Sequence, residues 1–319
     1  MKRHHYVLLV VLAIQIGVAA VVFWPRQVET LGSQAFFPGL TADQIVSVTI
    51  TNANGDSVTL QKEGGVWILP DAGNYPALVD KIDPLLEGIA GLTGGRLVTR
   101  TEGSHRRLQV ADDEFVRRVD FETAEGSYTF YMGSSPSYGA THVRLGGEDE
   151  TYVTDSLSTW DVVATVASWI DTLYWSVSQP EVSRITVENA NGTLVFVNEA
   201  DGNWVLEGLG ADEPQNEEAV AATVRQATTI NMLRPLGQEE QPEYGLDAPS
   251  AVVTLETASG EITLWVGAQD AEDESYVLFT SEADYYVQVA NYSVRRLVEG
   301  VRDDYIQQPP TPTPQGAPD

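Results

Sequence analysis

The sequence of 319 residues contains no cysteine. Disulfide bonds, thiol catalysis, iron–sulfur clusters and lipid attachment through a cysteine are therefore excluded, so hydrophobic cores must supply the stability. Histidine is also scarce: there are four, and only His105 and His142 lie beyond the first five residues. Two histidines cannot build a three-ligand zinc site without carboxylates, and nothing in their spacing indicates such a site.

Basic residues are few. Lys and Arg total 18 against 46 Asp and Glu, which gives a formal net charge of −28 at pH 7. A surface this negative repels the phosphates of nucleic acids, so we expect no nucleic-acid partner. Calcium capture is the sharper alternative to a solvated acidic exterior, with acidic runs at 148–150 and 270–274. Their spacing does not match an EF-hand loop, so we predict no metal site.

Catalytic motifs are missing too. The chain has no G-x-S-x-G elbow, no Walker-type loop and no H-E-x-x-H helix. His142 aligns with Tyr276 in the repeat described below, which favours packing, and His105 stands in a polar stretch beside Arg106 and Arg107. Paired carboxylates cannot be judged by spacing in so acidic a chain. We therefore predict a protein that is not an enzyme, with no catalytic residue and no cofactor.

One long apolar run is present. Residues 6–24 are uncharged, and at about 1.5 Å per residue they just cross a hydrocarbon core of roughly 30 Å. Tyr6 and Trp24 stand at the two ends, where amphipathic rings prefer the headgroup level, so we predict them as membrane-interface anchors. Lys2 and Arg3 precede the run, which predicts a single-pass protein of the cell membrane with a cytoplasmic N-terminus. The alternative is a cleaved signal peptide, but its apolar core is normally shorter.

The remainder of the chain repeats one pattern. Residues 48–55 read VTITNANG and residues 185–192 read ITVENANG, and at the same distance a tryptophan follows within an apolar strand, Trp67 or Trp204. Two units of about 135 residues therefore share one plan. Because the tryptophans recur with the module, we predict that they pack in its core.

A second match lies further along each unit. FETAEGSYTFYMG ends at Gly133 and LETASGEITLWVG ends at Gly267, and a Tyr-Val pair follows each, at 152–153 and at 286–287. Within this match Trp265 takes the place of Tyr131, which indicates an aromatic position of the module and weakens the idea of a glycan-stacking tryptophan.

Alternating apolar strands surround helical segments in both units. This arrangement predicts an α+β fold in which each repeat is an antiparallel sheet with one or two packed helices. Asn54-Gly55 predicts a type I′ turn between two strands. We expect helices at 76–92, with Pro84 distorting it, at 156–170, rich in aromatics including Trp160 and Trp169, at 216–232 and at 293–304.

The predicted organisation has five parts. They are a cytoplasmic start and transmembrane anchor (1–27), a juxtamembrane linker (28–43), α+β repeat 1 (44–178), α+β repeat 2 (179–306) and a disordered tail rich in Pro and Thr (307–319).

Several of these features together resemble a known family. They are the N-terminal span, the strand ending in Trp (DGNWVLE), the following helix and the segment YGLDAPSAVVTLETASGEITLWVG. This pattern is similar to the bacterial DUF4340 family, a domain of unknown function, over most of residues 44–306. YGLDAP at Tyr244–Pro249 is the most specific piece, and its counterpart LQVADDEF in repeat 1 lacks Gly and Pro. The resemblance implies an envelope component that accompanies ABC-type transporters, including gliding-motility systems, and it carries over no catalytic residue.

The sequence thus predicts a membrane-anchored extracytoplasmic interaction protein. It would contact the bilayer through one helix and a protein partner through its outward domains, as an accessory subunit of an ABC-type transporter or envelope complex. The alternative is an extracytoplasmic module that binds a glycan or a divalent cation.

Overall fold

The computed structural model describes residue 15 and residues 34–307. Apart from residue 15, the predicted membrane anchor with Tyr6 and Trp24 lies outside the described residues, as does the tail from residue 308 onward. Within the part that is described, no helix combines the length and apolarity needed to cross a bilayer.

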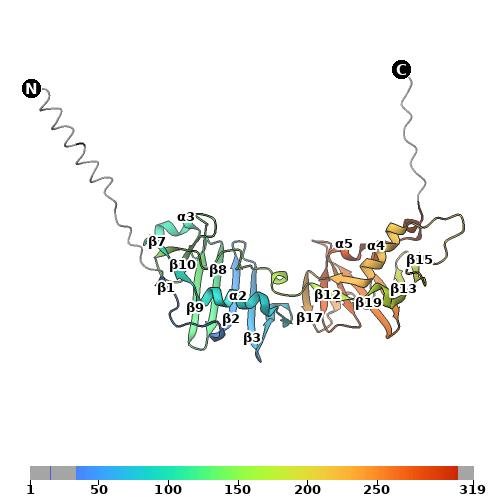
Figure 1. The fold of residues 1–319 in the computed structure, drawn as a ribbon, viewed down its shortest axis with the longest axis horizontal. Coiled ribbons are helices and arrows are strands. Elements are labelled where there is room, and N and C mark those ends of the chain that lie inside the picture. Colours follow the sequence, from blue (N-terminus) through green and yellow to red (C-terminus); the bar gives the residue numbers. More distant parts are fainter. Residues whose placement is uncertain (1–14, 16–33, 308–319) are drawn as a thin grey trace, which may run out of the picture.

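Two large antiparallel sheets dominate the fold and lie one after the other along the molecule (Figure 1). In spatial order, the first contains β5 (Tyr75–Pro76), β4 (Val66–Leu69), β3 (Ser57–Glu63), β2 (Ile45–Asn52), β8 (Arg117–Thr123), β9 (Gly126–Met132), β10 (Thr141–Leu145), β11 (Thr151–Thr154) and β7 (Arg96–Thr99). The second contains β15 (Trp204–Leu206), β14 (Gly192–Asn198), β13 (Val182–Asn189), β18 (Ala251–Thr257), β19 (Gly260–Gln269), β20 (Tyr276–Thr280), β21 (Tyr286–Val289) and β17 (Arg234–Gly237). Apart from β5, the strands follow the same order in both sheets, and the predicted α+β class is confirmed.

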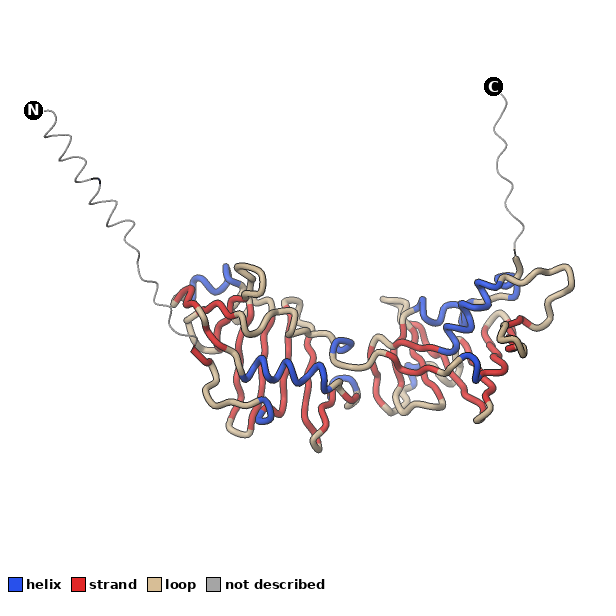
Figure 2. The backbone as a smooth tube through the Cα atoms, viewed as in Figure 1, coloured by secondary structure: helices blue, strands red, loops and turns tan. Residues whose placement is uncertain are grey.

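Helices cover one face of each sheet (Figure 2). In the first unit α2 (Val79–Ala90) buries four apolar residues spaced along one side, Ile82, Leu85, Leu86 and Ile89, and continues on both sides of Pro84. In the second unit α4 (Glu217–Thr228) packs against α5 (Asn291–Glu299). Both end before their predicted limits, because residues 229–231 turn into strand β16 and Gly300 follows α5.

A small sheet of two strands accompanies each large one. β1 (Gln34–Ala35) pairs with β6 (Thr93–Gly94), and β12 (Leu173–Ser176) pairs with β16 (Thr229–Asn231). Residues 34–43, predicted as linker, therefore form part of the first unit; we call residues 34–44 the entry segment.

The predicted aromatic helix at 156–170 is wrong. This segment, which we call the strap, contains only the short 3-10 helix η4 (Val166–Ser168). The Ser158 backbone N–H and hydroxyl donate to Asp161 Oδ2 at 2.9 and 2.6 Å, which closes a tight turn early in the segment. Such local side-chain bonds offer the backbone an alternative to helix.

The type I′ turn predicted at Asn54-Gly55 is also wrong, although the hairpin itself is present. Gly55 has a φ of +90°, but Asn54 is not among the residues with positive φ. Instead, Asn52 Oδ1 accepts the N–H groups of Asn54 and Asp56 at 2.9 and 3.0 Å. An asparagine at the start of the loop therefore holds this turn.

The two units touch where η2 (Pro70–Ala72) meets β17. Two glycines with positive φ lie at this junction, Gly73 (+68°) and Gly237 (+111°), and a Cβ on Gly73 would lie 2.3 Å from Gly237 Cα. Beside them the rings of Tyr75 and Tyr285 pack edge to face at 4.8 Å. The Tyr174 hydroxyl donates to the Tyr285 carbonyl at 2.7 Å, and burial raises the pKa of Tyr174, which keeps it a donor. Most buried apolar residues of both units form one connected cluster, and Leu108, Val110 and Tyr131 form a second, smaller one.

The glycine that ends each repeated segment is required by the same close backbone contact in both units. A Cβ on Gly133 would lie 2.1 Å from the Leu108 carbonyl oxygen, and a Cβ on Gly267 would lie 2.1 Å from the Tyr244 carbonyl oxygen. In both units a loop therefore rests its backbone directly on the end of a strand.

We expect Gly133→Ala to lower the free energy of unfolding by about 1–3 kcal/mol or more, because backbone cannot move aside for the added methyl group. Gly126→Ala in the same strand is the matched control, since a Cβ there meets nothing within 4 Å. Denaturant unfolding of both variants checks this, and equal losses for the two would contradict it.

In both units, the residue that follows the carbonyl in contact with the glycine has a left-handed backbone conformation. It is Gln109 (φ +57°) after the short helix α3 (His105–Leu108), and Gly245 (φ +64°) after η6 (Pro242–Tyr244). A non-glycine residue in this conformation carries about 1–2 kcal/mol of strain. The repeats thus supply their own comparison between a strained and a relaxed turn.

Gln109→Gly should raise the free energy of unfolding by about 0.5–1 kcal/mol. The relief of strain exceeds the extra chain entropy of about 0.5–1 kcal/mol that a glycine loses on folding. Thermal unfolding measures the effect, and a destabilised variant would show that the Gln109 side chain itself contributes to stability.

Candidate functional site

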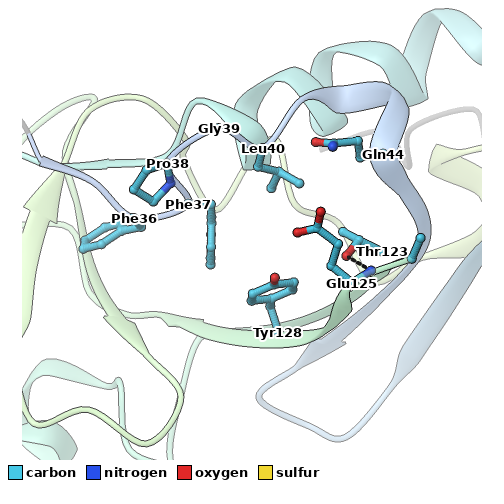
Figure 3. Close-up of a pocket in the computed structure, with 10 residues that line it drawn as sticks. Phe36, Phe37, Pro38, Gly39, Leu40, Gln44, Thr123, Glu125 and Tyr128 are labelled. Atoms are coloured by element: carbon cyan, nitrogen blue, oxygen red, sulfur yellow. Dashed lines mark hydrogen bonds between the residues drawn. The ribbon is translucent and has the colours of Figure 1, made fainter.

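A surface pocket of about 500 Å³ lies where the entry segment passes the hairpin between β8 and β9 (Figure 3). Phe36–Leu40 form one wall, and Thr123–Glu125 with Tyr128 form the other. The entry segment is fixed in this place by the β1–β6 pairing and by a hydrogen bond from the Phe36 N–H to the Leu92 carbonyl at 3.0 Å. Two parts of the chain that are distant in sequence therefore create the pocket.

Aromatic rings build the base of the pocket. Phe37 meets Phe121 edge to face at 5.0 Å, and Tyr128 stacks on the same Phe121 at 5.0 Å. Phe37 and Tyr128 also meet edge to face at 5.6 Å. Tyr128 remains 36% exposed, so a guest can reach part of its ring while its neighbours hold it in place.

One carboxylate points into the pocket. Figure 3 shows the Glu125 side chain directed into the space between Leu40 and Tyr128. The Thr123 hydroxyl oxygen accepts the Glu125 N–H at 3.1 Å, which positions the turn. Within the described part of the chain, no ion pair involves Glu125. An aromatic face beside a carboxylate and an aliphatic wall suits the long cationic side chain of Lys or Arg.

A second polar group centres on Arg144, which is only 3% exposed. Its Nε donates to the Val110 carbonyl at 2.6 Å, and its Nη1 donates to the Glu148 carbonyl at 3.1 Å. Its Nη2 pairs with Asp112, and its guanidinium lies over the ring of Tyr131, 4.5 Å from the centroid. Most of its donors are used within the protein. Arg144 therefore ties two loops together and leaves little capacity for a ligand.

The two histidines weighed in the sequence both lie in this unit and are both buried. His105 Nε2 forms a hydrogen bond of 2.9 Å with the Asp149 carbonyl, which indicates a packed ring where the sequence predicted a polar stretch. His142 Nδ1 donates to the Ser134 carbonyl at 2.7 Å. Burial lowers the pKa of His142 below its ordinary value of 6.5, so it is neutral at pH 7. Neither ring lies beside the aromatic pocket.

The acidic run at 270–274 uses two of its carboxylates to hold its own loop. Asp270 Oδ1 accepts the Glu272 N–H at 2.7 Å, and Asp273 Oδ1 accepts the Ser275 N–H at 3.0 Å. Across the residues that the structure describes, no group of three or more His, Asp or Glu side chains is placed to hold a metal ion.

The tryptophans divide into two kinds. Trp67 and Trp204 are buried, which confirms the core positions predicted from the repeat. Trp265 stacks on Phe279 at 5.9 Å, in the cross-strand position where the first unit pairs Tyr131 with Arg144. Trp160 is instead 88% exposed.

The Asp112–Arg144 ion pair leads us to predict how stability depends on pH. A hydrogen bond from Arg144 holds the pKa of Asp112 below its ordinary value of 3.8. A carboxyl group with a lowered folded-state pKa stabilises the fold above its unfolded pKa and loses that contribution as the pH falls through its folded pKa. Asp112→Asn should therefore lower the free energy of unfolding by about 1 kcal/mol at pH 7. The effect is small because the carboxylate is largely exposed. The difference from the wild type should shrink below pH 3.8.

Urea unfolding at pH 7 and at about pH 3 tests this. Asp113→Asn is the control, because Asp113 pairs with the exposed Arg106 and such pairs contribute about 0–1 kcal/mol. A deficit for Asp112→Asn that stays constant with pH would contradict the assignment.

Comparison with known proteins gives one match. Residues 67–219 fit the family described as "Domain of unknown function (DUF4340)". The match begins in β4 and ends in α4, so it includes part of both units. It does not reach Tyr244–Pro249, the most specific piece of the predicted resemblance. No curated protein and no solved structure matches the chain. The predicted resemblance is confirmed: residues 67–219 of this chain match the DUF4340 family.

Proposed function

We propose that this chain is a non-enzymatic interaction protein, anchored in the cell membrane by residues 6–24, whose two units face away from the cytoplasm and hold a partner in a membrane complex. In its sharper form the proposal makes it an accessory subunit of an ABC-type transporter. The aromatic pocket at Tyr128 receives a side chain of that partner.

The position of the pocket is the observation that supports this most. Its first residue, Phe36, follows Trp24, the predicted end of the span, by 12 positions (36 − 24). A fully extended chain covers at most about 3.3–3.6 Å per residue, so these positions span no more than about 43 Å. The pocket is thereby held near the predicted membrane surface, within reach of the outward loops of an integral membrane protein.

Charge supports the same reading. The chain carries a formal net charge of −28, which speeds encounter with basic surfaces and disfavours acidic ones. The pocket then adds local selectivity, because Glu125 faces the ring of Tyr128 and the aliphatic Leu40. A partner loop that presents Lys or Arg satisfies both the long-range and the local requirement.

The test is purification of the tagged full-length protein from its own membranes in mild detergent, followed by mass spectrometry. We expect transporter subunits in stoichiometric amounts with the wild type. Glu125→Gln and Tyr128→Ala should reduce their recovery at least about tenfold, because loss of one anchor residue typically costs more than about 1.4 kcal/mol of binding.

One control accompanies these variants. Tyr138→Ala removes a fully exposed tyrosine of the same unit and should leave recovery unchanged. Glu125→Gln keeps the size and packing of the side chain, so a loss of partner there cannot come from misfolding. The proposal fails if the wild type purifies alone, or if both pocket variants keep the same partners as the wild type.

A further inference from the structure

Trp160 is the one exposed tryptophan among the residues that the structure describes. Single exposed apolar side chains are ordinary and need no function to explain them. Trp160 differs in three respects. Hydrogen bonds fix the backbone that carries it, it borders a hollow, and the rim of that hollow combines both signs of charge with hydroxyl groups.

The strap that carries Trp160 is held from several sides. The Thr93 N–H donates to Ser156 Oγ at 3.2 Å, Arg117 Nε donates to the Val162 carbonyl at 2.7 Å, and the Leu78 N–H donates to the Trp169 carbonyl at 2.8 Å. The turn closed by Ser158 and Asp161 lies directly at Trp160. The indole is therefore presented on a preorganised segment, which reduces the entropic cost of binding.

The hollow beside Trp160 measures about 580 Å³ and lies between the strap and α2. Leu85 and Leu157 contribute its apolar lining. Gly88 of α2 makes this approach possible, because a Cβ there would lie 2.7 Å from Leu157 Cδ1. The volume falls within the range of about 300–1,000 Å³ that small-molecule sites occupy.

The rim combines both signs of charge with hydroxyl groups. Asp80 and Lys81 come from α2, and Asp161 and Ser168 come from the strap. The carboxylates accept hydrogen bonds, the ammonium group donates them, and the hydroxyl does either. Lys81 disfavours a cationic ligand, while Asp80 and Asp161 disfavour an anionic one.

From this lining we propose that the hollow between α2 and the strap binds a neutral saccharide, with Trp160 as its stacking platform. A sugar ring has an apolar face of C–H groups, which carry partial positive charge and suit the negative face of an indole. Its hydroxyl groups both donate and accept, so they match the mixed rim. This site lies on different elements from the Tyr128 pocket and is independent of the partner proposed there.

The second unit offers a comparison for this assignment. The chain that follows β21 forms the regular helix α5, which buries Val294 and Leu297 in the core. The chain that follows β11 forms the strap instead. The shared plan can therefore close its core with a helix at this point, and only the first unit has an exposed tryptophan there.

The experiment uses the full-length protein in a zwitterionic detergent without a sugar headgroup, so that the detergent cannot compete. The probes are tetramers of β-linked glucose and of β-linked N-acetylglucosamine. Binding is followed by calorimetry and by the quenching of tryptophan fluorescence with acrylamide, which reaches the exposed Trp160 in preference to buried indoles. We expect at least one tetramer to bind saturably and to protect the fluorescence from quenching.

Matched variants locate the site. Trp160→Ala should weaken binding at least about tenfold, which corresponds to 1.4 kcal/mol, and Asp80→Asn should weaken it less. Tyr292→Ala and Tyr138→Ala, which remove other exposed aromatic rings, should have no effect. The affinity for a neutral ligand should change less than about twofold between low and high salt, since screening acts only between charges. Circular dichroism confirms that each variant is folded.

Three results would overturn the proposal. The first is that neither tetramer binds the wild type saturably. The second is binding that survives Trp160→Ala. The third is binding of a tri-lysine peptide in place of the sugars, lost with Trp160→Ala and weakened by salt, which would assign the hollow to a basic protein segment.

Discussion

In each unit the contact between a loop carbonyl and a strand glycine fixes the position of that loop on the sheet. The Leu108 carbonyl lies against Gly133, and the Tyr244 carbonyl lies against Gly267, each so close that no side chain would fit. Because the loop is pressed onto the strand, the residues that follow Leu108 lie over β10, where Arg144 bonds Val110 and Asp112. The repeated glycines are thus a requirement of packing, and the sequences around them have been free to diverge.

That divergence gives the two units different surfaces on one plan. Where the first pairs Tyr131 with Arg144, the second pairs Trp265 with Phe279 and continues the stack onto Tyr286 at 4.4 Å. The first unit is also the one with the strap and with the aromatic pocket at its entry segment. Both candidate binding surfaces therefore lie in the unit nearer the predicted membrane span, and in the second unit helix α5 takes the place of the strap.

Much of the fold could be predicted because its signals are local. Alternation of apolar residues located the long strands, and the repeat located the buried Trp67 and Trp204. The strap was misread because its aromatic residues suggested a helix, while a side-chain turn at Ser158 decided the conformation. The entry segment was misread because two-residue strands have too little periodicity to register.

The candidate sites were harder to predict for a different reason. The Tyr128 pocket brings together residues 36–40 and 123–128, and nothing in either segment signals the other. The exposure of Trp160 depends on the turn closed by Ser158 and Asp161, in a segment that the sequence predicted as a helix. A site formed by segments that are distant in sequence has no characteristic spacing of residues. The role of a single residue such as Glu125 can therefore be judged only after the fold is known.

The junction between the units also makes their edges unequal. At the inner edge Gly237 stands opposite Tyr286, and it is Gly73 that must lack a side chain, because a Cβ there would lie 2.3 Å from Gly237 Cα. At the corresponding outer edge of the first unit, Leu97 stands opposite Tyr152. The join is head to tail and would propagate indefinitely if both edges were alike. A leucine stands at the free edge where the junction has a glycine, so the first unit does not offer at that edge the surface that Gly237 offers to Gly73.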